Sequence, residues 1–195
     1  MKKDITQLLK KTTLLHQFSW KSRVHQLKSI PAFVKRDDEL GFNSTGSKLR
    51  KYLSVLPFLI KEKPDEILVL GNSHSNNILG ISQLLIENSL PFKLFLLKGH
   101  ESEFNGNELF IRHLVDESKI YWYSRNENIE NILLNYQQLN PSKKIIIIPE
   151  GADHPSSLAG CLTLVADIKR NEEELGIEFD HIFLDLNEIR WCALS

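Results

Sequence analysis

The sequence contains little glycine. Nine glycines occur in 195 residues, whereas the usual content of ~7% would give about 14. None of them follows Gly176. Close approach of the backbone to a phosphate group generally relies on glycine. The chain therefore has few places at which a phosphate-binding loop could form.

Cysteine is also scarce, and long hydrophobic runs are missing. Cys161 and Cys192 show no Cys-x-x-Cys spacing, which predicts free thiols in a reducing compartment. The longest strongly apolar run, 145–148, is too short to span a bilayer. The N-terminus lacks the apolar core of a signal peptide. These absences predict a cytoplasmic protein with no membrane partner.

Charge is balanced overall but unevenly placed. The net charge is −1, yet residues 1–51 carry 12 Lys or Arg and only 4 Asp or Glu. A basic segment can bind nucleic acid or a phosphate ligand, but no zinc-finger spacing, RNP-type aromatic signature or dense arginine stripe accompanies it. We therefore expect no nucleic-acid partner, and we interpret most of these lysines as solvated surface residues.

Short apolar runs alternate with helical patterns along residues 67–151. With 42% hydrophobic residues, a chain of this length can bury a real core. Continuous apolar runs bounded by turns and separated by helices are typical of parallel strands with crossover helices. We predict an α/β fold, with an open parallel sheet and helices on both faces. Strands are expected at 33–35, 67–70, 93–97, 119–123, 144–148 and 181–184, and helices from about 47, over 78–86, 108–115 and 129–139, and from about 156 to 175.

Two polar segments follow predicted strands. Ligands of open α/β sheets bind at the carboxyl ends of the strands, which directs attention to 71–77 and 149–157. The first segment offers hydroxyl and amide groups at the start of a helix. A Ser/His hydrolase is a poor alternative, because the Gly-x-Ser-x-Gly elbow would need glycine where Ser75 stands. In the second segment, Asp153 and His154 lack a third ligand, so we predict no metal site.

A third segment, 45–51, contains a lysine at the start of a predicted helix. Ser47 suits the N-cap role, which would put Lys48 in the first turn. There the helix dipole disfavours a cation and so favours the neutral, nucleophilic amine. On spacing alone, a surface lysine explains the pattern better. The segment is not a P-loop, because the first glycine of that motif is absent.

Taken together, the three segments resemble a known enzyme family. Lys-Arg-Asp-Asp at 35–38 and Lys-Leu-Arg-Lys at 48–51 precede Ser-Asn at 75–76, Pro-Glu-Gly at 149–151 and Leu-Ala-Gly-Cys at 158–161. In this order the motifs are similar to those of the 1-aminocyclopropane-1-carboxylate deaminase and D-cysteine desulfhydrase family. These are pyridoxal 5′-phosphate enzymes of the tryptophan-synthase-β fold type. The resemblance runs from about residue 33 to 184.

The resemblance implies pyridoxal 5′-phosphate as cofactor and a small amino acid as substrate. Lys48 would form the Schiff base, Ser75 would contact the substrate as nucleophile or polar group, and Asn76 would hydrogen-bond the cofactor's ring oxygen. The implied reactions are β-elimination from a D-cysteine-type substrate and deamination of aminocyclopropane carboxylate. The resemblance also implies a partial cofactor domain, 1–51 and 155–195, around a small α/β domain, 52–154, and it allows a homodimer.

The sequence departs from the family in several places, among them Ser47 before the lysine and Asn77 after the Ser-Asn pair. The family's Pro-x-Gly-Gly segment ends here in Ala152 instead of glycine. Its last strand leads into a Gly/Ser/Thr-rich phosphate loop, but residues 185–195 contain no glycine and include Asp185 and Glu188, whose charges oppose a phosphate. We therefore predict a truncation or frameshift near Asp185, with the second half of the fold missing. Two hypotheses remain: a lyase or deaminase with impaired cofactor binding, and a non-catalytic remnant that acts as an interaction module.

Overall fold

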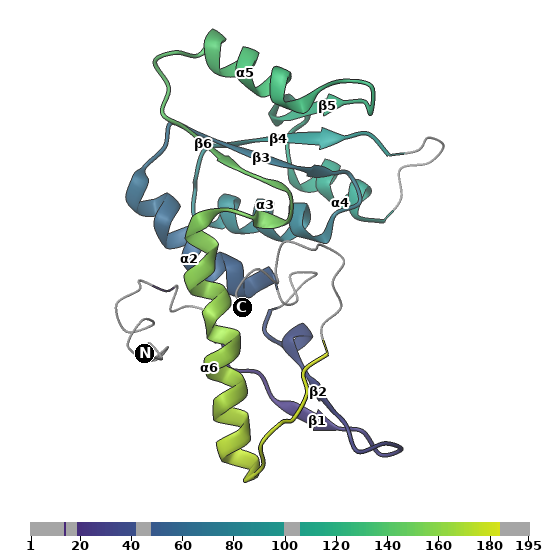
Figure 1. Ribbon diagram of the computed structural model, residues 1–195. Coiled ribbons are helices and arrows are strands. Elements are labelled where there is room, and N and C mark those ends of the chain that lie inside the picture. The colour runs from purple at the N-terminus through teal and green to yellow at the C-terminus, as the bar shows by residue number, and fades with distance from the viewer. Residues whose placement is uncertain (1–13, 15–18, 42–47, 100–105, 184–195) are drawn as a thin grey trace.

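The computed structural model describes residues 14, 19–41, 48–99 and 106–183 (Figure 1). Its centre is a four-stranded parallel sheet with the strand order β5-β4-β3-β6. The strands are β3 (Glu66–Asn72), β4 (Phe92–Leu97), β5 (Ile120–Tyr123) and β6 (Ile145–Ile148). All four expected runs between 67 and 148 therefore form strands of one sheet.

Helices cover both faces of this sheet. They are α2 (Lys48–Glu62), α3 (Asn76–Glu87), α4 (Gly106–Leu114) and α5 (Ile129–Leu139). On one face, Leu68 and Phe95 pack against Leu133 of α5. On the other face, strand residues such as Val69 join a larger core with residues of α2, α3 and α4, and Figure 1 shows α5 and α3 on opposite sides of the sheet. Burial on both faces explains the continuous apolar runs, and the predicted α/β class is confirmed.

A long helix connects the sheet to a separate hairpin. The helix α6 (Leu158–Leu175) runs from the sheet toward the antiparallel pair β1 (Val24–Gln26) and β2 (Phe33–Lys35) (Figure 1). Helix α6 packs along α2 at its upper end, where Gly160 lies against Arg50. Short 3-10 helices complete the described elements: η1 (Asp37–Glu39), η2 (Glu117–Lys119), η3 (Glu150–Ala152) and η4 (Pro155–Ser157).

The strand expected at 181–184 does not form over its described residues. His181–Phe183 have no regular secondary structure, and the side chain of Phe183 is 93% exposed. The segment after α6 passes the hairpin instead, where the rings of Phe33 and Phe179 meet at 5.4 Å. An apolar run becomes a strand only when a neighbouring strand pairs with it, and no strand of the described residues does so here. Leu184 lies outside the described residues.

None of the helices in the described ranges is long and apolar enough to cross a membrane.

Candidate functional site

The carboxyl ends of β3 and β6 form the point at which the sheet changes direction. The chain continues from β3 through β4 and β5 on one side, whereas β6 pairs with β3 on the other side. Loops that leave such a pair diverge, and ligands of open α/β sheets bind in the resulting crevice. The side-chain amide of Asn72 donates to Glu150 Oε1 at 3.2 Å and links the two loops. The segments 71–77 and 149–157 therefore lie together at this edge.

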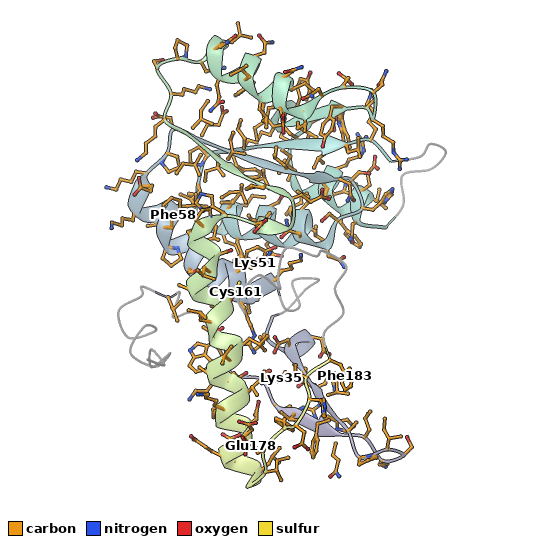
Figure 2. All side chains as sticks on the ribbon, in the orientation of Figure 1. Lys35, Lys51, Phe58, Cys161, Glu178 and Phe183 are labelled. Carbon is orange, nitrogen blue, oxygen red and sulfur yellow. The ribbon has the colours of Figure 1, made fainter. Side chains whose placement is uncertain are left out.

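The first turns of α2 contact both loops. Tyr52 Oη donates to Asn77 Oδ1 at 2.7 Å, and burial raises the pKa of Tyr52, so the phenol keeps its proton. Lys51 Nζ donates to the carbonyl of Gly151 at 2.7 Å, and Figure 2 labels Lys51 where α2 passes beside α6. Lys48 is the first residue of α2, half-buried, and one turn before Tyr52. Lys48 and Tyr52 therefore lie on the same side of α2, one helical turn apart.

Ser75 and Asn76 begin α3 and do not cap it with their side chains. Ser75 occupies the N-cap position with extended backbone angles, yet its hydroxyl makes no capping hydrogen bond. Asn76 is exposed, and its Oδ1 accepts a hydrogen bond from Asn107 at 2.6 Å. The Ser75 hydroxyl and the Asn76 amide nitrogen thus have no acceptor within the part of the chain that the structure describes. Ser47, expected to cap α2, lies outside that part.

Two buried polar atoms beside these residues have no hydrogen-bond partner. They are Ser73 Oγ and Asn77 Nδ2, and Ser82 Oγ further along α3 is the third such atom among the described residues. Ser73 is fully buried and Asn77 is 4% exposed. Leaving such groups unsatisfied costs free energy. Their grouping at the β3–α3 junction is consistent with a polar ligand at this edge.

The charged motifs at 35–38 and 48–51 contribute to a buried ion cluster that sequence reasoning missed. Arg50 Nε and Nη2 donate to the two oxygens of Asp37 at 2.6 and 2.7 Å, and Nη2 also reaches Asp167 at 2.9 Å. Lys35 Nζ donates to the same Asp167 oxygen, and Arg170 pairs with its other oxygen at 2.7 Å. The cluster ties together β2, η1, α2 and α6, and so fixes the helix that carries Lys48.

Burial of these charges adds exceptions to the interpretation that most lysines of the basic segment are solvated. The basic segment is not uniformly a solvated surface, since Arg50 and Lys51 are only 2% and 3% exposed, and the Lys35 side chain is 19% exposed. A signal was present in the sequence: Thr163, Asp167 and Asn171 recur every four residues along one face of α6, and all three are buried. A polar stripe on a buried helix face requires buried partners.

Ionic partners set the protonation of this cluster. Burial raises the pKa of Asp167, but hydrogen bonds from Lys35, the Ser22 backbone, Arg50 and Arg170 outweigh it and lower the pKa to about 2. Burial also lowers the pKa of Lys35, with Asp167 acting in the opposite direction. The carboxylate is therefore an anion throughout the neutral range.

The loop after β6 contains a strained residue. Gly151 and Ala152 both have positive φ, 69° and 55°, a conformation that glycine adopts freely and alanine does not. Ala152 is fully buried and stands where the resembling family has its second glycine. His154 Nδ1 accepts from the Ser156 backbone at 3.2 Å and lies 2.7 Å from its hydroxyl. The loop thus contains two consecutive residues in the left-handed conformation, although only one of them is glycine.

The other candidate groups of this region are structural. Burial lowers the pKa of His154, whose ring packs on Phe58 with centroids 5.0 Å apart. Cys161 is a free thiol whose pKa burial raises to about 11, and Cys192 lies outside the described residues. No group of three His, Cys, Asp or Glu side chains that could hold a metal ion occurs in the described ranges.

Several known proteins are similar to this chain. No family model matches the chain. A protein of Pyrococcus furiosus named "putative 1-aminocyclopropane-1-carboxylate deaminase" is 26% identical over 194 residues, which cover 93% of this chain and 57% of the relative. Proteins of the same name from Pyrococcus horikoshii and Thermotoga maritima are 25% and 29% identical, over 93% and 77% of this chain. The chain is similar in sequence to these proteins named as putative 1-aminocyclopropane-1-carboxylate deaminases.

A solved structure confirms the fold. The crystal structure of an "ACC deaminase homologue" superposes with a TM-score of 0.66 at 21% identity, covering 93% of this chain and 55% of that one. The resemblance drawn from the motifs and the predicted fold type are therefore both confirmed. The chain spans about half the length of the relatives it matches, 57% for the Pyrococcus furiosus protein and 48% for that of Thermotoga maritima.

Proposed function

We propose that this chain binds the ring of pyridoxal 5′-phosphate at the carboxyl edge of its sheet and acts on a small amino acid as a lyase or deaminase. The observation that carries the proposal is the hydrogen bond between Tyr52 and Asn77. It fastens the turn that begins with Lys48 to the loop that holds Ser75 and Asn76. Relatives named as deaminases of an amino acid support the substrate class.

The residues present fit the ring end of this cofactor. Lys48 begins the helical turn that leads to Tyr52, Ser75 and Asn76 directly precede Asn77 in the sequence, and buried Ser73 Oγ and Asn77 Nδ2 lack partners among the described residues. The phosphate end has less support, because no glycine follows Gly176 and close approach to a phosphate favours glycine. We therefore expect binding through the imine and the ring more than through the phosphate.

Each residue has a distinct role in this proposal. Lys48 would supply the amine that holds the cofactor and could serve as a base toward the substrate. Ser75 offers its hydroxyl to the substrate, and Asn76 donates to the ring oxygen. When bound, the cofactor supplies an electron sink for charge that develops on the substrate. Both β-elimination from a D-cysteine-type substrate and deamination of aminocyclopropane carboxylate are compatible with this arrangement.

The proposal includes a division into two domains. Residues 52–154 would form the small α/β domain, and 1–51 with 155–195 would belong to the cofactor domain. Supporting this, all four strands of the parallel sheet fall between Glu66 and Ile148, whereas the hairpin β1–β2 and helix α6 lie outside that range. Helix α2 connects the two parts.

The test is trapping of the imine. Purified protein is titrated with pyridoxal 5′-phosphate, reduced with borohydride and digested, and the modified lysine is located by mass spectrometry. We expect visible absorbance and a single label on Lys48, both lost in Lys48→Ala and kept in Lys61→Ala, which changes an exposed lysine of the same helix. Absorbance that persists in Lys48→Ala, or a label on another lysine, would refute the assignment.

A second candidate is a non-catalytic module that self-associates. Leu158 and Val165 lie two turns apart on α6 and remain 47% and 39% exposed, and exposed apolar helix faces mark association sites. This function predicts a concentration-dependent dimer that Val165→Glu dissociates, with no cofactor absorbance. A monomer at all concentrations in analytical ultracentrifugation would exclude it.

A further inference from the structure

We infer that Asn107 is a positioning residue that locks the side-chain amide of Asn76 with its nitrogen facing the ligand. The inference rests on the proposed function, since the ligand oxygen it serves belongs to the cofactor ring. Asn107 is the second residue of α4 and reaches across to the loop after β3. Its role goes beyond the residues that would touch the cofactor themselves.

The geometry consists of two hydrogen bonds from one nitrogen. Asn107 Nδ2 donates to the backbone carbonyl of His74 at 2.9 Å and to Oδ1 of Asn76 at 2.6 Å. The two acceptors lie on either side of Ser75. The first turn of α4 therefore holds the segment that contains both proposed ligand contacts.

The orientation of Asn76 follows from what each group can donate or accept. A backbone carbonyl only accepts, so the atom of Asn107 that faces His74 must be the nitrogen. That nitrogen carries a second hydrogen, which must point at an acceptor, so the Asn76 atom facing it is Oδ1. The Asn76 nitrogen is then turned away from α4. Within the described ranges it has no acceptor, and the residue is exposed.

Such a lock matters because an exposed asparagine amide can otherwise turn round. Either orientation satisfies solvent equally well, and only one presents a donor to an oxygen. A donor fixed in advance loses less conformational freedom when the ligand binds. The ring oxygen of pyridoxal 5′-phosphate carries negative charge or lone pairs, and it gains a hydrogen bond from Nδ2 but is repelled by Oδ1.

The substitution Asn107→Asp reverses the lock. A carboxylate cannot donate to His74 or to Asn76 Oδ1, and it accepts from Asn76 Nδ2 instead. Asn76 would then present its oxygen to the ligand. Asn107→Ala removes the lock without favouring either orientation.

Comparison of two cofactor forms distinguishes a change in the orientation of the Asn76 amide from a general loss of cofactor binding. Dissociation constants are measured by absorbance for pyridoxal 5′-phosphate and for its analogue without the 3-hydroxyl. A hydrogen bond to a charged oxygen gives a preference of roughly tenfold for the natural form in the unsubstituted protein. We expect this preference to vanish in Asn107→Asp, with affinity for the analogue unchanged, and to be reduced in Asn107→Ala.

The matched control is Asn128→Asp. It adds the same charge in the loop after β5, and aspartate can accept the capping hydrogen bond that Asn128 accepts from the Asn131 backbone. Both dissociation constants should stay as they are. If Asn107→Asp weakens the two cofactor forms equally, or leaves the preference intact, the positioning role is wrong. If the unsubstituted protein binds neither form, the proposed function itself fails.

A measurement without cofactor tests the lock independently. In ¹⁵N-labelled protein, the side-chain amide protons of Asn107 should exchange slowly and those of Asn76 rapidly. In Asn107→Asp the Asn76 amide protons should become protected. Slow exchange of the Asn76 amide in the unsubstituted protein would overturn the inference whatever the cofactor does.

Discussion

A Cβ atom added to Gly160 would lie 1.9 Å from the backbone carbonyl oxygen of Arg50. The two helices α2 and α6 therefore touch backbone to backbone at this position. The Gly160 N–H donates to Ser54 Oγ at 2.9 Å, and that hydroxyl donates to the Ser156 carbonyl at 2.6 Å. This crossing attaches the loop after β6 to the helix that carries Lys48.

We expect Gly160→Ala to separate these helices and destabilise the fold by about 3 kcal/mol, because the clash is with backbone and cannot be relieved by a rotamer change. Urea unfolding followed by circular dichroism measures the loss. Glu173→Ala, on the exposed end of α6, should leave the midpoint unchanged. A Gly160→Ala midpoint equal to that of the control would show that the helices do not meet so closely.

Two neighbouring aspartates of the motif at 35–38 should differ sharply in how much their substitution lowers the free energy of unfolding. Asp37 receives two hydrogen bonds from buried Arg50 and one from Ser22, so Asp37→Asn should cost about 3 kcal/mol by leaving a buried guanidinium poorly compensated. Asp38 pairs with Arg36 at the surface, and Asp38→Asn should hardly shift the unfolding midpoint. Equal midpoints for the two variants would contradict the buried cluster.

The sheet could be predicted from the sequence, but the elements around it could not. Apolar runs such as 67–70 are strong signals because residues on both of their faces are buried. The strand Val24–Gln26 is three residues long and largely exposed, so no pattern marks it. The run at 181–184 shows the converse error, since its apolar residues are exposed where they are described. Periodicity reports burial, and burial depends on neighbours that the sequence does not identify.

The meeting of the two candidate loops could be predicted from the sequence, but the contacts that support them could not. The rule that ligands bind at carboxyl ends of parallel strands identified 71–77 and 149–157, and these segments do meet. The supporting contacts were not predictable, because Asn107 follows a different strand and reaches the site only through tertiary packing. Arg50 and Asp167 were missed for another reason: charged residues are mostly exposed, so their burial can be inferred only when the partners are known.

Acid should weaken the fold through Asp167. Its pKa is about 2 in the folded protein against an ordinary value of 3.8, so the unfolded chain takes up the proton first as the pH falls. The stabilisation of about 2 kcal/mol is complete above pH ~5 and is lost progressively between about pH 4 and pH 2. Carboxyl ¹³C NMR should show an Asp167 midpoint near 2. A midpoint at or above 3.8 would mean that the ion cluster does not stabilise the anion.

Because the chain contains few glycines, a residue other than glycine stands at the end of α2, where the backbone is left-handed and a glycine could be introduced. Lys63 follows α2 with a φ of 47°, and its N–H bonds to the Leu59 carbonyl at 3.0 Å, which is the place that glycine usually takes at a helix end. Lys63→Gly should stabilise the fold by roughly 0.5 kcal/mol or more, as relief of the left-handed conformation exceeds the added chain entropy. Lys61→Gly, inside the helix, should cost about 1 kcal/mol. If both variants are destabilised alike, the backbone at Lys63 is not left-handed.

The small number of glycines also leads us to expect that the cofactor phosphate contributes little to binding. No glycine follows Gly176 in the sequence, and Asp185 and Glu188 stand in its last segment, so glycine does not ease close approach of this segment to a dianion and two charges oppose it. Pyridoxal, which has no phosphate, should therefore bind within a few-fold of pyridoxal 5′-phosphate, whereas a built phosphate site would separate the two by a hundredfold or more. Titration of the imine absorbance with each aldehyde measures the ratio, and Lys48→Ala sets the background. A large preference for the phosphorylated form would mean that other residues of this chain hold the phosphate, and Asp185→Ser with Glu188→Ser would then be expected to raise that preference further.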